Sequence, residues 1–273
     1  MKIIFFGNTK YSLIGAKIIH QQIGISQIVT IPDGPLSQFA KENNIPTVQT
    51  SKLTDEILSE LKSMEPDFLV VEDYGLILPK RLLDIPKKAS INVHHSLLPK
   101  YRGPSPAPFA ILEGEKTSGV SIIHMSEKVD AGDVYDQVEY KLTDDETTDS
   151  LLTKLNQLGG ELAVKVINEI VEKKAKAVKQ DEGKVTYTKM LKKEDGFIDI
   201  TNPPDKEKAS RMIRAFYPWP GVWTKAFINS KELIIKLLPE QTVQVEGKKP
   251  QSFKDFINGY KEGEEILTRL KLN

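Results

Sequence analysis

Short apolar runs alternate with helical patterns along the first half of this 273-residue chain. Continuous apolar runs predict buried strands at 2–6, 26–31, 68–72, 90–94 and 119–125. Between them, apolar positions recur with a helical period at 11–23, 36–43, 53–63 and 104–114. Because strand and helix alternate, the pattern predicts an α/β fold with a mostly parallel, doubly wound sheet. Ligands of such sheets bind beyond the carboxyl ends of the strands.

The second half predicts a different organisation. We expect a strand over Val134–Lys141 and a long amphipathic helix from Glu146 to about Lys174. Residues 179–205 are charged, weakly periodic and interrupted by prolines, which is typical of a linker with little structure of its own. We therefore predict a catalytic domain at 1–178, a linker at 179–205 and a small β-rich domain at 206–273, with short strands near 223–228, 232–238 and 242–245.

A polar pair interrupts the apolar strand at 90–94. Alternate side chains of a strand point to opposite faces, so Asn92 and His94 share one face and His95 lies on the other. Burying a polar group without a hydrogen-bond partner costs about 1 to 3 kcal/mol of folding free energy, so we expect these side chains to have partners or a function. One interpretation is a hydrogen-bonded core histidine. The Leu97-Leu98-Pro99 exit and the later Asp130-Ala131-Gly132 turn favour a reaction centre instead.

These motifs resemble the folate-dependent formyltransferases, whose pattern is Asn-x-His-x-Ser-Leu-Leu-Pro followed by a distant Asp-x-Gly. Four further blocks extend the resemblance over nearly the whole chain and are most similar to the members that act on charged tRNA. They are Tyr74–Lys80, Ser96–Gly103, Thr188–Asp199 and Arg214–Gly221. The resemblance implies a Rossmann-like formyltransferase domain followed by a small barrel of the OB type. This chain lacks one pair of the barrel strands, which predicts a truncated barrel.

The resemblance implies transfer of a formyl group from 10-formyltetrahydrofolate to the α-amino group of charged initiator tRNA. Asn92 and His94 would stabilise an oxyanion, and Asp130 would assist proton transfer. The folate would lie against residues of the strand exit and of the loop after the third predicted strand, namely Ser96, Leu97, Leu98, Pro99 and Leu76. We also predict substrate contacts from Arg102, whose guanidinium suits a phosphate or carboxylate, and from the turn at Gly7 and Asn8.

Composition limits the classes of protein to which this chain can belong. The chain has no cysteine, which excludes thiolate chemistry and disulfides. No apolar run reaches the length of about 20 residues that spans a bilayer, so we expect no membrane contact. The first residues do not have the pattern of a secretory signal. We therefore expect a cytoplasmic protein, and we expect it to be a monomer. No metal is required: Asp130, Asp133 and Asp136 lack the ligand order of a calcium loop.

Charge and loop length bear on the acceptor. Net charge is zero overall, yet residues 1–174 hold 19 Lys and Arg against 24 Asp and Glu, whereas 175–273 hold 19 against 14. A basic C-terminal part suits a polyanion such as tRNA, and the alternative interpretation is a set of ordinary solvated lysines. The segment 31–37 is short where tRNA-formylating relatives carry a long basic loop. Two alternatives therefore stay open: a formyltransferase for a small amine, such as an amino-sugar nucleotide or glycinamide ribonucleotide, and a non-catalytic RNA-binding or ligand-binding protein.

Overall fold

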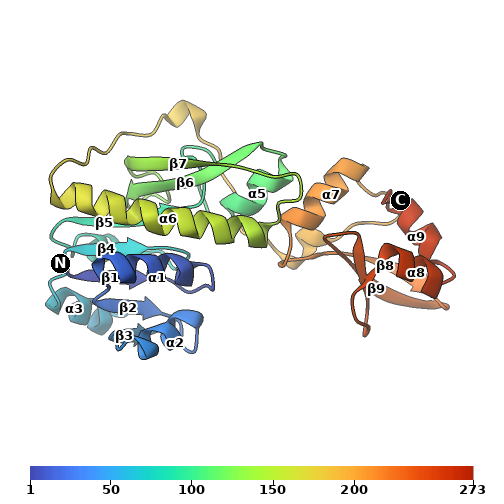
Figure 1. Cartoon of the computed structure of the whole chain (residues 1–273), viewed down its shortest axis with the longest axis horizontal. Helices are drawn as coiled ribbons and strands as arrows, with labels where there is room; N and C mark the ends of the chain where they lie inside the picture. Colours follow the sequence, from blue (N-terminus) through green and yellow to red (C-terminus); the bar gives the residue numbers. More distant parts are fainter. Residues whose placement is uncertain (273) are drawn as a thin grey trace. The chain divides into compact units, whose positions relative to one another are not determined.

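The computed structural model describes residues 1–272, which divide into two compact units. Unit 1 comprises residues 1–106, 117–141 and 152–188, and unit 2 comprises 107–116, 142–151 and 189–273. Each unit has one sheet of its own, shown with its helices in Figure 1.

The sheet of unit 1 has seven strands in the order β3-β2-β1-β4-β5-β6-β7. Their bounds are β1 Ile3–Phe6, β2 Gln27–Thr30, β3 Thr47–Gln49, β4 Phe68–Val71, β5 Ala89–His94, β6 Thr117–His124 and β7 Val134–Lys141. The first five strands pair in parallel, and β6 and β7 are antiparallel. The predicted doubly wound sheet is confirmed. The strand order reverses next to β1, where β2 lies on one side and β4 on the other.

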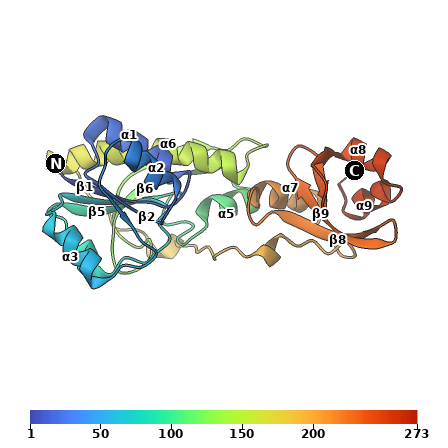
Figure 2. The same ribbon diagram turned by 90° about the horizontal axis from the view of Figure 1, so that it is seen from below.

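Helices cover both faces of this sheet. α1 (Ser12–Ile23) and α6 (Thr148–Val171) lie on one face and α3 (Asp55–Ser63) on the other, as Figure 2 shows. Two glycines allow the close approach on the first face: a side chain at Gly160 would lie 3.0 Å from Gly15 Cα, and one at Gly159 would lie 2.5 Å from Val93. The remaining helices of the first 112 residues are α2 (Pro35–Glu42), α4 (Lys80–Leu83) and α5 (Pro106–Leu112).

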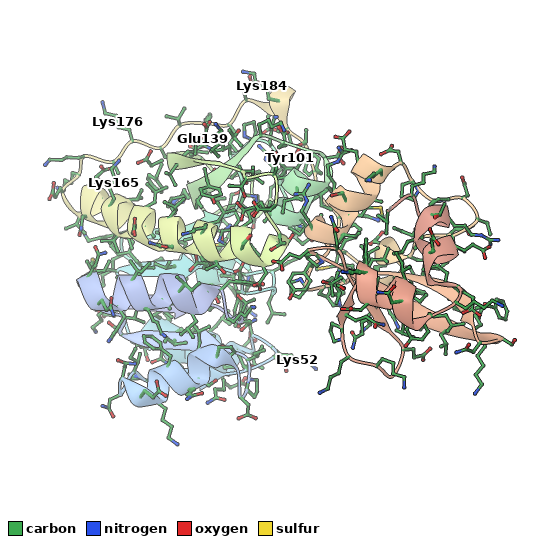
Figure 3. The ribbon with its side chains drawn as sticks, turned by 45° about the vertical axis from the view of Figure 1, so that its right-hand side comes forward. Lys52, Tyr101, Glu139, Lys165, Lys176 and Lys184 are labelled. Carbon is green, nitrogen blue, oxygen red and sulfur yellow. The ribbon has the colours of Figure 1, made fainter. Side chains whose placement is uncertain are left out.

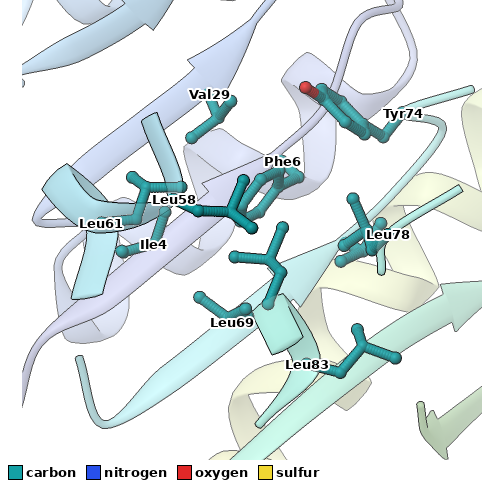
Figure 4. Close-up of a cluster of buried hydrophobic side chains, with 11 residues drawn as sticks. Ile4, Phe6, Val29, Leu58, Leu61, Leu69, Tyr74, Leu78 and Leu83 are labelled. Atoms are coloured by element: carbon teal, nitrogen blue, oxygen red, sulfur yellow. The ribbon is translucent and has the colours of Figure 1, made fainter. Parts of the chain in front are cut away.

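Alternation along the strands builds the core on the α3 face. Ile4 and Phe6 of β1 and Leu69 of β4 meet Leu58 and Leu61 of α3, and all five are at most 6 % exposed. Tyr74 packs edge-on against Phe6, with ring centroids 5.2 Å apart (Figure 4). This packing continues past the last strand residue of β4, so it fixes the chain where the strands end.

Unit 2 contains a four-stranded antiparallel sheet in the order β11-β10-β9-β8. The strands are β8 Val222–Ile228, β9 Lys231–Leu238, β10 Thr242–Val245 and β11 Gln251–Ser252. Three predicted strands are confirmed here as β8, β9 and β10, and no pairing among the described residues joins β11 to β8 to close a barrel. Helices α7 (Lys206–Ala215), α8 (Phe253–Gly259) and α9 (Gly263–Arg269), together with short 3-10 turns at Glu182–Lys184 and Lys193–Gly196, complete the chain.

Candidate active site

Asn92, His94 and Asp130 meet at the carboxyl end of β5. Asn92 Nδ2 donates to Asp130 Oδ1 at 3.3 Å, and His94 Nδ1 lies 3.5 Å from the same oxygen. The other oxygen of Asp130 accepts a hydrogen bond from the Gly103 backbone N–H at 2.8 Å. The predicted alternation of strand side chains is visible in these contacts, because Asn92 and His94 share one carboxylate.

Burial and hydrogen bonding fix the state of His94. Its side chain is only 6 % exposed, and Nε2 donates to the Tyr101 carbonyl at 3.0 Å, since a carbonyl can only accept. Burial lowers the pKa of His94 below its ordinary value, while the charge of Asp130 and the Tyr101 carbonyl act in the opposite direction. A neutral imidazole with its proton on Nε2 leaves Nδ1 as an acceptor facing Asp130.

A second group of charges lies behind the first. His95 Nδ1 is 3.4 Å from Asp73 Oδ1, and His95 Nε2 is 3.7 Å from Glu72 Oε1. Burial opposes the charged form of His95, but Asp73 and Glu72 outweigh it and raise the pKa of His95 to about 10. Thr9 Oγ1 donates to Asp73 at 3.2 Å. The ends of β1, β4 and β5 are thus joined by side chains where the strands stop pairing.

The residues predicted to hold folate differ in their surroundings. Ser96 Oγ donates to the Lys100 carbonyl at 2.6 Å, and Leu98 is 4 % exposed, with its N–H bonded to Ser121. Both help hold the turn after β5. Leu97 and Pro99 are half-buried, and Leu76 is 38 % exposed in the loop after β4. Contact of these five residues with folate stays a prediction.

The residues predicted to bind substrate form hydrogen bonds with other residues of the protein. Arg102 is 2 % exposed, and its guanidinium bonds to Gln180 and Glu182. Asn8 Oδ1 accepts from the Ile31 N–H at 3.0 Å, and its amide nitrogen donates to the Tyr74 carbonyl. The Gly7 N–H bonds to the carbonyl of Val29. These contacts hold neighbouring segments of unit 1 in place, and substrate binding by the three residues remains a prediction.

Sequence reasoning missed Gln180, Glu182 and the Glu72–His95 pair. Gln180 and Glu182 both fall in the predicted linker, where no periodic pattern marks them. Two adjacent acids directly after a buried strand, Glu72 and Asp73, could have been noticed as partners for His95, which directly follows the neighbouring strand. Among residues 1–272, no cluster of three or more His, Cys, Asp or Glu side chains is placed to hold a metal ion.

Unit 2 contains a cavity of about 400 Å³ that shares no residue with this site. Phe109, Leu112, Arg211 and Met212 are among the residues that line it. Within the described part of the chain, no helix is long and apolar enough to cross a membrane.

The doubly wound sheet, with amide, imidazole and carboxyl groups at the carboxyl end of β5, defines an α/β protein with a candidate active site suited to acyl-group chemistry. The formyl transferase family model matches residues 1–167, and the model of the formyl transferase C-terminal domain matches 190–242. The chain therefore belongs to the formyl transferase family.

Individual relatives agree with this assignment. The chain is 37 % identical over 237 residues to the methionyl-tRNA formyltransferase of Halalkalibacterium halodurans, covering 82 % of this chain and 74 % of that protein. It is 33 % identical over 301 aligned residues to the methionyl-tRNA formyltransferase of Thermodesulfovibrio yellowstonii, covering 95 % and 96 %. A sugar N-formyltransferase structure from a Shewanella species shares the fold, with a TM-score of 0.69, 17 % identity and coverage of 88 % and 98 %.

Proposed function

We propose that the chain transfers the formyl group of 10-formyltetrahydrofolate to the α-amino group of methionyl-tRNA. The observation that carries the proposal is the convergence of Asn92, His94 and Asp130 at the end of β5, in a chain that matches a methionyl-tRNA formyltransferase along nearly its full length. We infer a cytoplasmic location from that reaction. A monomeric state stays a prediction.

The geometry suits direct attack of the amine on the formyl carbon. A bond forms from the amine nitrogen to that carbon, and the carbonyl electron pair moves onto oxygen. The Asn92 amide would stabilise this oxyanion through an N–H. The His94 imidazole would join it by turning its Nε2 N–H from the Tyr101 carbonyl to the oxyanion, and loss of one such donor typically costs about 10²- to 10³-fold in rate. The tetrahedral carbon then expels the folate nitrogen, which takes up a proton.

Asp130 is suited to receive the proton that the amine loses. His94 Nδ1 and Asp130 Oδ1 are both acceptors and lie 3.5 Å apart, so a proton between them relieves their repulsion. The Asp130 carboxylate is already oriented by Gly103 and Asn92, which leaves little reorganisation for the transfer. The same proton can then be returned to the leaving nitrogen.

Surface features of unit 2 favour a nucleic-acid acceptor. Along β8, Lys225 and Phe227 are exposed, and the residues that alternate with them, Thr224, Ala226 and Ile228, are buried. Trp223 on the same face packs against Phe197 with the two rings tilted by 49° and their centroids 4.7 Å apart, and Lys193 Nζ lies 5.8 Å from the centroid of the Trp223 ring. Exposed aromatic rings interleaved with lysines are typical of RNA-binding surfaces. This supports tRNA over a small amine.

The second candidate, a small-amine formyltransferase, is favoured by one observation. Only Ile31–Gly34 join β2 to α2, so no long basic loop is present at this point of the chain. The sugar N-formyltransferase that shares the fold has this chain's general architecture at low identity, which does not decide the acceptor.

One assay tests the function. Purified protein is given 10-formyltetrahydrofolate with charged initiator tRNA, an amino-sugar nucleotide or glycinamide ribonucleotide in parallel reactions. We expect formylation of the tRNA and a large fall, on the order of 10²-fold or more, in His94→Ala and Asp130→Asn. The control His124→Ala removes an exposed imidazole of β6 and should keep turnover. Near-native rates in both site variants would refute the assigned roles.

A further inference from the structure

The segment that follows α6 is bound to the candidate active site. We call residues 178–188 the return segment; Figure 3 labels Lys184 on it and Tyr101 in the loop after β5. Val178 and Val134 exchange two backbone hydrogen bonds of 2.8 Å. Arg102 donates its N–H to the Thr186 carbonyl at 2.9 Å and accepts from the Thr188 N–H at 2.8 Å. The return segment is therefore held by isolated backbone bridges, to the start of β7 at Val134 and to the loop after β5 at Arg102.

One side chain of the return segment, that of Gln180, contacts both the turn at Asp130 and Arg102 in the loop after β5. Gln180 Nε2 donates to the carbonyls of Asp130 and Gly132 at 2.8 and 2.7 Å. Gln180 Oε1 accepts from Arg102 Nε and an Arg102 terminal nitrogen at 3.0 and 2.8 Å. These partners allow only one orientation of the amide, because carbonyls cannot donate and a guanidinium cannot accept. The amide is thus fixed between the Asp130 turn and Arg102.

The turn that Gln180 holds is conformationally demanding. Asp130 has φ 51°, in the left-handed region that residues with a side chain rarely adopt. On its other side the turn lies against β6, where a Cβ at Gly132 would be 1.6 Å from the His124 carbonyl oxygen. A residue stays in such a conformation when several surrounding contacts hold it there. The Gln180 amide supplies part of that constraint.

We propose that Gln180 is a positioning residue: its amide holds the Asp130 turn so that the carboxylate stays directed at Asn92 and His94. The proposal rests on the proposed function for its kinetic consequence. The contacts that carry it are independent of any substrate, because they join Gln180 to backbone carbonyls within unit 1. Loss of the amide should let the turn relax and move the carboxylate away from His94.

The test uses Gln180→Met, which keeps the length of the side chain and removes its hydrogen bonds. Lys179→Met is the matched control, because it introduces the same side chain at an exposed neighbour. We expect kcat to fall about tenfold in Gln180→Met with KM for the folate donor within about threefold, as for a lost interaction that acts in the transition state. Lys179→Met should match the wild type.

A second readout needs no substrate. The titration midpoint of His94 is followed by NMR of its imidazole in the ligand-free protein. Asp130, the Tyr101 carbonyl, His95 and Asp73 are the groups that influence it. If Asp130 moves away, the midpoint should fall by about 0.5 pH unit or more in Gln180→Met. A purely structural role for Gln180 would lower stability without moving this midpoint.

The outcomes separate the two proposals. A wild-type midpoint together with wild-type kcat per folded molecule in Gln180→Met overturns the positioning role and leaves the function standing. If the wild type formylates no acceptor, the proposed function fails, and the NMR midpoint alone decides the role of Gln180. Should Gln180→Met fail to fold, Gln180→Asn, whose amide is one methylene too short to reach both partners, is measured in the same way.

Discussion

Replacing Glu72 by glutamine should remove a specific part of the pH dependence of stability. Glu72 is 0 % exposed, and neither of its carboxylate oxygens has a hydrogen-bond partner among the described residues. It is enclosed by α1, where a Cβ at Gly15 would lie 2.0 Å from Glu72 Oε2, and by Gly159 of α6. Burial raises the pKa of Glu72 from 4.5 to about 7, against the favourable charge of His95.

The direction follows from proton linkage. An acid with a raised pKa in the folded state loses its proton first in the unfolded state, so stability falls as pH rises from 4.5 to about 7. At about 1.4 kcal/mol per pKa unit, the full loss is about 3 kcal/mol, of which about 2 kcal/mol falls between about pH 5 and 6.5. His95, with its pKa raised from 6.5 to about 10, contributes stability that is lost only above 6.5.

The measurement is urea unfolding of wild type and Glu72→Gln at pH 5 and 6.5, followed by circular dichroism and by hydrogen exchange of β4 and β5 amides. Tryptophan fluorescence is unsuitable for unit 1, because Trp219 and Trp223 are both in unit 2. Glu60→Gln, at an exposed position of α3, is the matched control. Its free energy of unfolding should differ between pH 5 and 6.5 by as much as that of the wild type. If the free energy of unfolding changed by the same amount between pH 5 and 6.5 in wild type and in Glu72→Gln, the reasoning would be refuted.

Two further changes test the packing of unit 1. Gly15→Ala forces a methyl group against the Glu72 carboxylate and should lower the free energy of unfolding by about 1 to 3 kcal/mol, measured by urea denaturation, while activity per folded molecule is kept. Arg102→Lys loses the paired hydrogen bonds to Gln180 and Glu182, so limited proteolysis should cut the return segment about fivefold faster. Unchanged unfolding or unchanged cleavage would contradict these expectations.

The fold of unit 1 was largely predictable because its central strands are buried on both faces and read as continuous apolar runs. The strand β3 escaped prediction because its three residues are half-buried or exposed at an edge of the sheet. α4 is a single turn of four residues, too short for a helical period. α7 was hidden by its composition, since only Ala209, Ile213 and Ala215 of its ten residues are buried.

The candidate site was predictable where residue types are unusual for their position. Asn92 and His94 are polar in a buried strand, and the structure brings them to Asp130, the carboxylate that the family resemblance had implied as their partner. Gln180 could not be found in this way. Its position is set by contacts between segments some 50 and 78 residues apart in the sequence, and a polar residue in a charged stretch looks like any exposed residue.

The two adjacent histidines at the end of β5, His94 and His95, show how neighbouring residues can hold the same side chain in opposite protonation states. The pKa of His94 is lowered, chiefly by burial, whereas that of His95 is raised by two carboxylates that outweigh burial. At neutral pH His95 is therefore charged, and its charge further disfavours a proton on His94 Nδ1. Environments that shift the pKa values of two titratable groups in opposite directions are typical of active sites in which one group acts as an acid and another as a base. His94 is thus kept neutral, with its one proton on Nε2 toward the Tyr101 carbonyl, which supports the proposal that Asp130 accepts the proton of the amine.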